Sequence, residues 1–452
     1  MHPIVTLSQC TAALREGTTR SQALVDQALE RIASPDGEGA RAFTRVYADT
    51  ARQAAQVSDT LRAAGQARSG IEGLPVSVKD LFDVAGDTTL AGSVALQGHP
   101  AATEDAVAVQ RLKAAGAVIV GRTNMTEFAF SGLGINPHYG TPLNPWDRST
   151  GRIPGGSSSG AAVSVSDGMA LAGLGSDTGG SLRIPAALCG LVGFKPTASR
   201  VSAQGALPLS TSLDSIGAIA PSVACCAQLD AILSGEAPTL RPASLKGLRL
   251  AVPSTLVMDG MDAEVARGLE RALSRLSALG AVLQELAVPA FARLGSINAK
   301  GGLVAAEAWA WHRELLASSG ARYDPRVSSR IQRGQAISAA DYIDVLNART
   351  AWIAEVQAQV ADHDALVMPT VPVIAPKLAE TAASDEVYTQ TNLLILRNPT
   401  LINFLDGCAI SLPCHRAGEA PVGLSLAGLG GQDRRLLSVA LAVEQLLASA
   451  QG

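Results

Sequence analysis

The chain has 452 residues, a formal net charge of −4 and 47% hydrophobic residues. This composition provides enough apolar material for a large buried core, built as one α/β domain or as two closely packed ones. The slight acidity argues against nucleic-acid binding, and no stretch reaches the roughly 20 apolar residues that span a bilayer, so we expect neither nucleic acid nor membrane as a partner.

The N-terminal residues and the cysteines predict a cytoplasmic protein. Residues 1–17 lack a basic stretch followed by an apolar core, so we expect no secretory signal. Six cysteines are spread from Cys10 to Cys414 without a C-x-x-C pair. In a long chain without a signal, this pattern favours buried free thiols in a reducing compartment and no structural zinc.

The first part of the chain predicts a helix and then a strand–helix–strand unit. Residues 21–33 carry their apolar side chains on one helical face. Residues 74–78 read LPVSV and predict a buried strand that runs into Lys79. Residues 104–115 predict a helix and 117–121 a second strand. This order indicates a crossover unit on a parallel or mixed sheet.

The rest of the chain begins with a segment of unusual composition. Residues 150–220 are rich in Gly, Ser, Ala and Pro, and they predict closely packed backbone around a site. A polar connection follows at 235–247, then strands at 248–252, 365–368, 409–412 and 422–427. We expect helices at 263–279 and from about Asp433, which could serve as the N-cap of the last helix.

Two serines and a lysine form a candidate nucleophile and base. Ser157 lies in PGGSSSG (154–160), and Ser181 follows 24 residues later in GSDTGGSLR (175–183). Lys79 ends an apolar strand, where burial disfavours its charged form and lets it act as a base. The backbone N–H groups of residues 178–181 could turn towards one point and form an oxyanion hole. This constellation needs no histidine.

Other catalytic motifs fit the sequence less well. The segment 156–160 matches G-x-S-x-G, but TGRIPG precedes it where a nucleophile elbow needs a strand. No lysine follows a serine at S-x-x-K spacing, and the glycine run lacks the Lys-Ser/Thr of a P-loop. The six histidines form no ligand pair. We therefore expect no metal and no cofactor.

These motifs resemble the amidase signature family over most of the chain. The resemblance rests on LPVSVKDLFDVAG (74–86), GAVIVGRTNMTEF (116–128), NPWD (144–147), PGGSSSGAAVSV (154–165) and LGSDTGGSLRIPAALCGLVGFKPT (174–197). It implies that Ser181 is the nucleophile, Ser157 the bridging serine after a cis peptide bond, and Lys79 the base. It also implies an oxyanion hole from Thr178, Gly179, Gly180 and Ser181. Ser159 departs from the family, which often has glycine there.

The resemblance also implies a fold and a reaction. We expect one α/β domain over residues 1–452, with a central mixed sheet of many strands covered by helices on both faces. The signature core would span about 65–230 and peripheral helices about 253–360. The reaction would be hydrolysis of a small carboxamide through an acyl-enzyme on Ser181, with a homodimer also allowed.

Two segments are candidates for substrate binding. Phe128, Ala129, Phe130 and Ser131 match the stretch that lines the acyl pocket in the family, although two phenylalanines spaced by two residues would also suit a core strand. Residues 323–334 resemble the segment of glutamine amidotransferase A subunits that holds the substrate carboxylate, and Arg330 matches its arginine. The alternative for Arg330 is an ordinary exposed helix arginine.

Two other functions remain open at this point. The chain could be the glutamine-hydrolysing A subunit of a tRNA-dependent amidotransferase, which has the same triad. Against this, the aspartate that binds the glutamine amino group in such subunits falls near Arg397 here. A catalytically inactive binding subunit is the second alternative, and the intact triad argues against it. The identity of the amide is not encoded in any motif.

Overall fold

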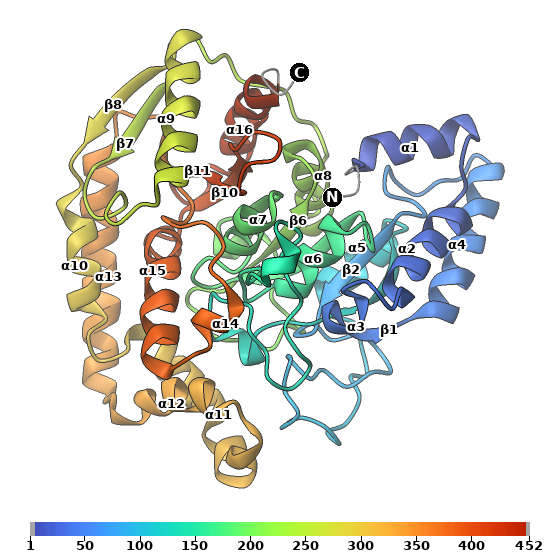
Figure 1. The fold of residues 1–452 in the computed structure, drawn as a ribbon, viewed down its shortest axis with the longest axis horizontal. Coiled ribbons are helices and arrows are strands. Elements are labelled where there is room, and N and C mark those ends of the chain that lie inside the picture. The colour runs from blue at the N-terminus through green and yellow to red at the C-terminus, as the bar shows by residue number, and fades with distance from the viewer. Residues whose placement is uncertain (1–4, 449–452) are drawn as a thin grey trace.

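A computed structural model describes residues 5–448 of the chain. Within these residues, eleven strands form one sheet in the order β1-β3-β2-β4-β6-β5-β10-β11-β9-β7-β8 (Figure 1). The strands are β1 (Phe43–Val46), β2 (Pro75–Lys79), β3 (Val118–Thr123), β4 (Ala172–Asp177), β5 (Val192–Lys195), β6 (Ser215–Ala220), β7 (Arg249–Pro253), β8 (Val282–Leu286), β9 (Ala365–Pro369), β10 (Cys408–Pro413) and β11 (Gly423–Gly428).

Helices surround the sheet. The longer ones are α1 (Leu7–Glu16), α2 (Ser21–Ala33), α4 (Ala48–Ala63), α5 (Val107–Ala114), α6 (Ser159–Ser166), α8 (Val223–Ser234), α9 (Ala263–Ala278), α10 (Pro289–Ile297), α11 (Gly302–Ser319), α12 (Pro325–Gln332), α13 (Ala339–Val360), α15 (Asp385–Phe404) and α16 (Asp433–Ala448). The short ones are α3 (Gly39–Ala42), α7 (Arg183–Cys189) and α14 (Leu378–Thr381), with 3₁₀ turns at Glu127–Ala129, Arg148–Thr150, Ala198–Arg200, Gly320–Arg322 and Arg333–Ala336.

The sheet is mixed, and its parallel part positions the candidate site. Strand β2 pairs in parallel with β3 on one side and with β4 on the other. The helix α5 between β2 and β3 makes this the predicted crossover unit. Because the carboxyl ends of parallel strands lie at the same edge of a sheet, Lys79 at the end of β2 and Asp177 at the end of β4 lie at one edge.

Both faces of the sheet are buried, which confirms the expected architecture. Along β9, Ala365 and Val367 belong to one hydrophobic cluster, whereas Leu366 and Met368 belong to another. Successive side chains of a strand point to opposite faces, so these two clusters lie on opposite sides of the sheet. Helices must therefore cover both faces, as a strand buried on both sides requires.

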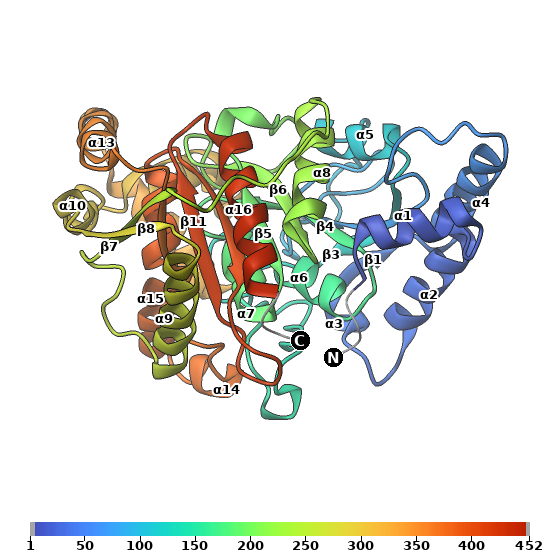
Figure 2. The ribbon, with the colours of Figure 1, turned by 90° about the horizontal axis from the view of Figure 1, so that it is seen from above.

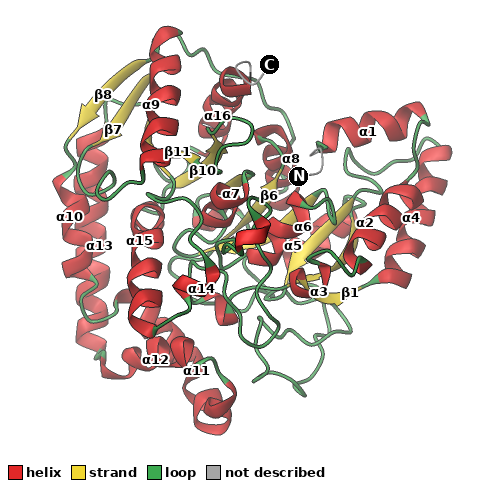
Figure 3. Cartoon of the chain, viewed as in Figure 1, coloured by secondary structure: helices red, strands yellow, loops and turns green. Residues whose placement is uncertain are grey.

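The helices lie in two layers on the sheet and at the two ends of the molecule. Helices α8 and α16 pack on each other and on strands β6 and β10, whereas α6 and α7 pack on each other and on β4 and β5. Figures 1 and 2 place α10 and α13 at one end of the molecule and α2 and α4 at the other. Figure 3 shows the strands running through the middle of this helical shell. No helix within residues 5–448 is long and apolar enough to cross a bilayer.

Most expected elements are confirmed, and the differences have physical causes. The predicted strands and helices lie within two or three residues of their observed bounds. Strand β8 was not expected, because it lies at the edge of the sheet and most of its side chains are exposed. Asp433 does not cap its helix. It is the first helical residue, and its carboxylate accepts hydrogen bonds from Thr197 N and Thr197 Oγ1.

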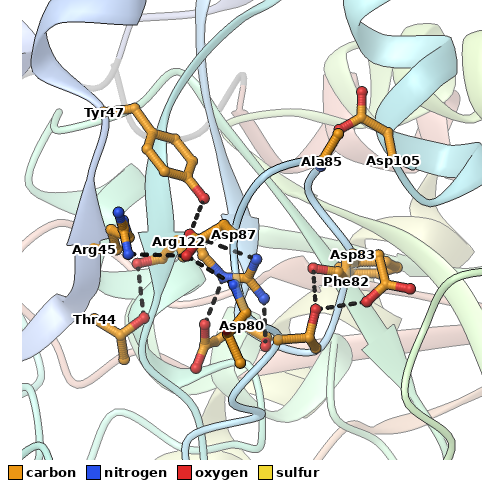
Figure 4. A network of polar contacts seen from close by, with 12 residues as sticks. Thr44, Arg45, Tyr47, Asp80, Phe82, Asp83, Ala85, Asp87, Asp105 and Arg122 are labelled. Atoms are coloured by element: carbon orange, nitrogen blue, oxygen red, sulfur yellow. Dashed lines mark hydrogen bonds and ion pairs between the residues drawn. The ribbon is translucent and has the colours of Figure 1, made fainter. Parts of the chain in front are cut away.

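A buried ion pair fixes the residue that follows Lys79. Arg122 Nε donates to Asp80 Oδ1 at 2.7 Å, and both side chains are 1% exposed. Asp80 Oδ2 accepts the N–H of Gly92, and Arg122 Nη2 donates to the Asp80 carbonyl. Tyr47 and Asp87 extend this network towards the surface (Figure 4). The pair therefore ties the end of β2 to β3 and to the loop that contains Gly92.

We expect Arg122→Met to lower the free energy of unfolding by about 3–5 kcal/mol, because it leaves the Asp80 carboxylate buried without its cation. Urea unfolding followed by circular dichroism measures this loss. Arg45→Met is the matched control. The Arg45 side chain pairs with Asp87 but is itself 61% exposed, so its loss should change the free energy of unfolding little. A loss below about 1 kcal/mol in Arg122→Met would contradict the anchoring role of the pair.

Candidate active site

Lys79 is fully buried and lies between two serines. Its Nζ is 2.7 Å from Ser157 Oγ and 2.9 Å from Ser176 Oγ. Its relative exposure is 0%. The strand β2 is buried along its whole length, so the alkyl chain of Lys79 lies within the sheet and only its amine reaches the serines. The structure thus brings the predicted base into contact with one of the two predicted serines.

Burial makes the neutral form of Lys79 accessible at ordinary pH. Loss of hydration lowers the pKa of Lys79 to about 7, against the opposite effect of the carboxylates of Asp177 and Asp214. As the pH rises through this value, the ammonium gives up its proton and becomes an amine that can accept one. An amine at this position can therefore serve as a base.

A backbone hydrogen bond joins the loop that contains Ser157 to the loop that contains Ser181. The peptide bond between Gly156 and Ser157 is cis. The N–H of Ser158 donates to the Ser181 carbonyl at 3.4 Å, so the two loops touch next to Lys79. Ser157 is fully buried, whereas Ser181 is 3% exposed. Within residues 5–448 the Ser181 hydroxyl has no hydrogen-bond partner, and no hydrogen bond joins it to Ser157 in this structure.

The turn between β4 and α7 is organised by Asp177. Its carboxylate accepts the N–H groups of Gly180 and Leu182, and it forms a two-pronged ion pair with Arg183. Gly180 has a φ of +126°, and a Cβ at this position would come within 2.6 Å of the Ile184 and Pro399 side chains. Glycine is therefore the only residue that suits position 180 of this turn.

Asp177 is held in its charged form. Burial would raise the pKa of Asp177, but its ion pair with Arg183 and the amide of Asn403 bring the pKa well below its usual range. Arg183 also donates to the Pro399 carbonyl and to Asn403 Oδ1, and Lys195 donates to the carbonyls of Pro196 and Gly407. Arg183 and Lys195 thus have structural roles. Asp177 orients loop backbone, but Ser158 donates to the Ser176 carbonyl and not to Asp177.

The N–H groups of the turn are not equivalent. That of Gly180 already donates to Asp177 at 2.8 Å. Among the described residues, the N–H groups of Thr178, Gly179 and Ser181 have no acceptor. Of the four predicted oxyanion donors, these three are therefore free to bind a negatively charged oxygen in this conformation.

The segment 127–131 is a tight turn and not a strand. Phe128 and Ala129 both have positive φ, at +50° and +60°. The Phe128 ring is 1% exposed and lies 4.4 Å from the His312 ring and 5.0 Å from the Tyr323 ring, between ring centroids. Burial lowers the pKa of His312 to about 3, so that this cluster is uncharged. The strand alternative for this segment is wrong, because its backbone turns at two successive residues.

The remaining candidates for substrate binding lie along the same segment. Ser131 Oγ donates to Asn392 Oδ1 in α15. Arg330 of α12 donates from Nη1 to the Phe130 carbonyl at 2.8 Å, and its guanidinium lies 4.9 Å from the centroid of the Tyr388 ring. Arg330 is half-buried, and it is therefore not a freely exposed helix arginine. These contacts connect α12 and α15 to the turn.

A cavity of about 420 Å³ lies beside the turn. Its wall includes Ala129, Ser176, Thr178 and Asp214, together with apolar side chains of residues 203–209. Ser176, Asp214, Asn392 and Asn403 were not predicted from the sequence. A signal for Asp214 did exist, since it is the only charged residue between Arg200 and Asp230. Within residues 5–448, no group of three His, Cys, Asp or Glu side chains is arranged to hold a metal ion.

Known proteins are similar to this chain in sequence and in fold. A family model described as Amidase matches residues 23–437. The chain is 36% identical over 452 residues to the 2-amino-5-chloromuconic acid deaminase of Comamonas testosteroni, with 98% of this chain and 96% of that protein covered. It is 35% identical over 481 residues to the A subunit of the glutamyl-tRNA(Gln) amidotransferase of Anaeromyxobacter sp. (strain K), with the same coverage. A crystal structure of an amidase matches with a TM-score of 0.88 and 33% identity, over 99% of this chain and 100% of that one.

The titration of Lys79 can be followed by carbon-13 NMR of the lysine Cε atoms. We expect two resonances to titrate well below the usual lysine range, because burial lowers the pKa of Lys79 to about 7 and that of Lys195 to about 8. Lys79→Met should remove the first resonance and Lys195→Met the second. A Lys79 resonance that titrates above about 9 would contradict the role of burial.

Proposed function

The chain belongs to the amidase family and is a hydrolase of amide C–N bonds, and on this basis we propose that it cleaves a small carboxamide with Lys79, Ser157 and Ser181. The observation that carries the proposal is the 2.7 Å contact between Lys79 Nζ and Ser157 Oγ in a fully buried place. A lysine with a pKa of about 7 is a base of suitable strength for a reaction near neutral pH.

The first half of the proposed reaction forms an acyl-enzyme. Ser181 Oγ attacks the amide carbon, Ser157 takes the proton of Ser181, and neutral Lys79 takes the proton of Ser157. The carbonyl oxygen becomes negatively charged and is bound by the free N–H groups of Thr178, Gly179 and Ser181. Ser176, the second hydrogen-bond partner of Lys79, keeps the amine directed towards Ser157.

The second half releases both products. The C–N bond breaks as Ser157 passes a proton to the departing nitrogen and takes one back from the Lys79 ammonium. Ammonia or an amine leaves, and Lys79 is neutral again. A water molecule then loses a proton through the same relay and attacks the acyl carbon, and Ser181 regains its hydroxyl hydrogen. The net change is one amide and one water converted to a carboxylic acid and an amine. This relay uses groups of the chain alone.

We further propose that good substrates contain a carboxylate near the scissile amide. Arg330 Nη1 binds the Phe130 carbonyl, next to the turn that the family uses to line its acyl pocket. The other N–H groups of the Arg330 guanidinium can then bind a substrate carboxylate. Arginine binds such a planar anion with two parallel hydrogen bonds. A relative with 36% identity is named for an acid, 2-amino-5-chloromuconic acid, which supports this substrate class.

A second candidate function is glutamine hydrolysis as the A subunit of an amidotransferase. The 35% identity to one of these proteins over 98% of this chain favours it. Against it stands Arg397, near the position of the aspartate that binds the glutamine amino group in those proteins. Arg397 donates to the Val257 carbonyl and to Asn398, and a cation there would repel an amino group. Ammonia release by the isolated chain from amides other than glutamine distinguishes the two functions.

We expect Ser181→Ala and Lys79→Ala each to remove most of kcat, by about 10³-fold or more, without loss of the fold. Ser157→Ala should be similarly severe, because it interrupts the proton relay. The measurement is ammonia release from a panel of acidic and neutral amides between pH 6 and 9. In the wild type, kcat/KM should rise through about pH 7, as Lys79 becomes neutral. Near-normal turnover by Lys79→Ala at any of these pH values would rule out the mechanism.

Substitution of Arg330 tests the carboxylate. We expect Arg330→Met to raise KM for acidic substrates by about tenfold to a hundredfold, since a hydrogen bond to a charged group contributes about 1.5–3 kcal/mol. KM for neutral amides should change far less. Arg326→Met is the matched control, because Arg326 lies over the same Tyr388 ring but pairs with the exposed Asp385. The carboxylate proposal fails if Arg330→Met leaves KM unchanged for acidic substrates, or if only neutral lipophilic amides are hydrolysed.

A further inference from the structure

Asp214 is a half-buried carboxylate in direct contact with the Gly-rich turn. Thr178 Oγ1 donates to Asp214 Oδ1 at 2.5 Å. The N–H groups of Leu209 and Ser210 donate to the same carboxylate at 3.0–3.2 Å. Asp214 therefore connects Thr178, the first residue after β4, to the segment 209–214. This contact is separate from those of Asp177, whose carboxylate holds Gly180, Leu182 and Arg183.

The segment 209–214 is itself firmly held. Glu307 of α11 accepts hydrogen bonds from the hydroxyl groups of Ser210, Thr211 and Ser212, and from the N–H of Ser212. The Tyr342 hydroxyl of α13 donates to the same carboxylate. Arg349 of α13 donates to the carbonyl of Ser212. The segment thus cannot shift without breaking contacts to two helices, and Asp214 provides a fixed support for Thr178.

The same carboxylate lies near the buried amine. Asp214 and Ser176 line one cavity of about 420 Å³, and Ser176 Oγ is the second partner of Lys79 Nζ. We propose that Asp214 is a positioning residue of the active site: through the Thr178 hydroxyl it fixes the oxyanion turn, and through its charge it raises the pH at which Lys79 becomes active. This inference rests on the proposed amidase mechanism and goes beyond the triad and its oxyanion donors.

The charge of Asp214 acts among several other charges. Lys79 in β2 is the cation on which its charge acts, together with the charge of Asp177 in β4. Glu307 of α11 opposes the ionisation of Asp214, Arg349 of α13 binds the same segment at Ser212, and Asp406 lines the same cavity. Burial raises the pKa of Asp214 to about 6, despite the hydrogen bonds from Thr178 and the backbone. When Asp214 is ionised, its negative charge favours the ammonium form of Lys79.

The experiment compares Asp214→Asn, Thr178→Val and the wild type by kcat, KM and the pH profile of kcat/KM. In Asp214→Asn we expect kcat to fall about tenfold or more, because the amide NH2 cannot accept the N–H groups of Leu209 and Ser210 and the support of Thr178 is loosened. The acid limb of the profile should also move to lower pH by more than about 0.3 units, since a neutral amide no longer favours the ammonium of Lys79. Thr178→Val keeps the carboxylate, so it should lower kcat without moving the acid limb.

Asp433→Asn is the matched control. Asp433 is a buried carboxylate that, like Asp214, accepts a threonine hydroxyl and a backbone N–H, both from Thr197. Its substitution should lower the melting temperature but leave kcat and the acid limb unchanged. The inference is overturned if Asp214→Asn and Thr178→Val both keep the wild-type kcat, or if the acid limb of Asp214→Asn does not move. It is also overturned if Asp433→Asn reproduces both effects. An inactive Ser181→Ala beside any of these results leaves the proposed function standing, whereas an active Ser181→Ala removes it.

Discussion

The burial of Lys79 is the constraint on which the whole site depends. Removing its ammonium from water lowers its pKa, and the two serine hydroxyls that surround Nζ cannot replace the lost hydration. Two carboxylates lie nearby, but each has its own partners: Asp177 pairs with Arg183, and Asp214 binds Thr178 and backbone N–H groups. Neither forms a salt bridge with Lys79, so the lysine can lose its proton close to neutral pH.

The sheet explains how such a costly arrangement is maintained. Strand β2 has a parallel neighbour on each side, so its backbone is held by hydrogen bonds on both edges. Directly after Lys79, the Asp80–Arg122 pair fixes the chain again. The Gly-rich turn that follows β4 begins at the same edge of the sheet. The candidate base and the turn are thus positioned by rigid elements, as a catalytic site would require.

The candidate substrate-binding residues lie on a turn and on peripheral helices, whereas Lys79 lies on the central sheet. Phe130 and Ser131 belong to a short turn, and their neighbours Arg330 and Asn392 come from α12 and α15, about 200 and 260 residues further along the chain. Loops and peripheral helices vary more readily than a buried sheet. This division suits a family in which one hydrolytic centre serves different amides, and it explains why the site around Lys79 is easier to interpret than the substrate pocket.

The sequence by itself determined the local features of this protein. The apolar run before Lys79, the two Gly- and Ser-rich segments and their spacing predicted the crossover unit, the buried lysine and the candidate serines, because strand burial and glycine turns follow from neighbouring residues. Only the tertiary structure decided what lies around them. Ser176, Asp214, Glu307 and Asn403 act through contacts between residues up to 226 positions apart. The uncharged stretch around Asp214 singles it out in the sequence, but it does not tell which groups Asp214 contacts, since only folding determines its partners and its access to water.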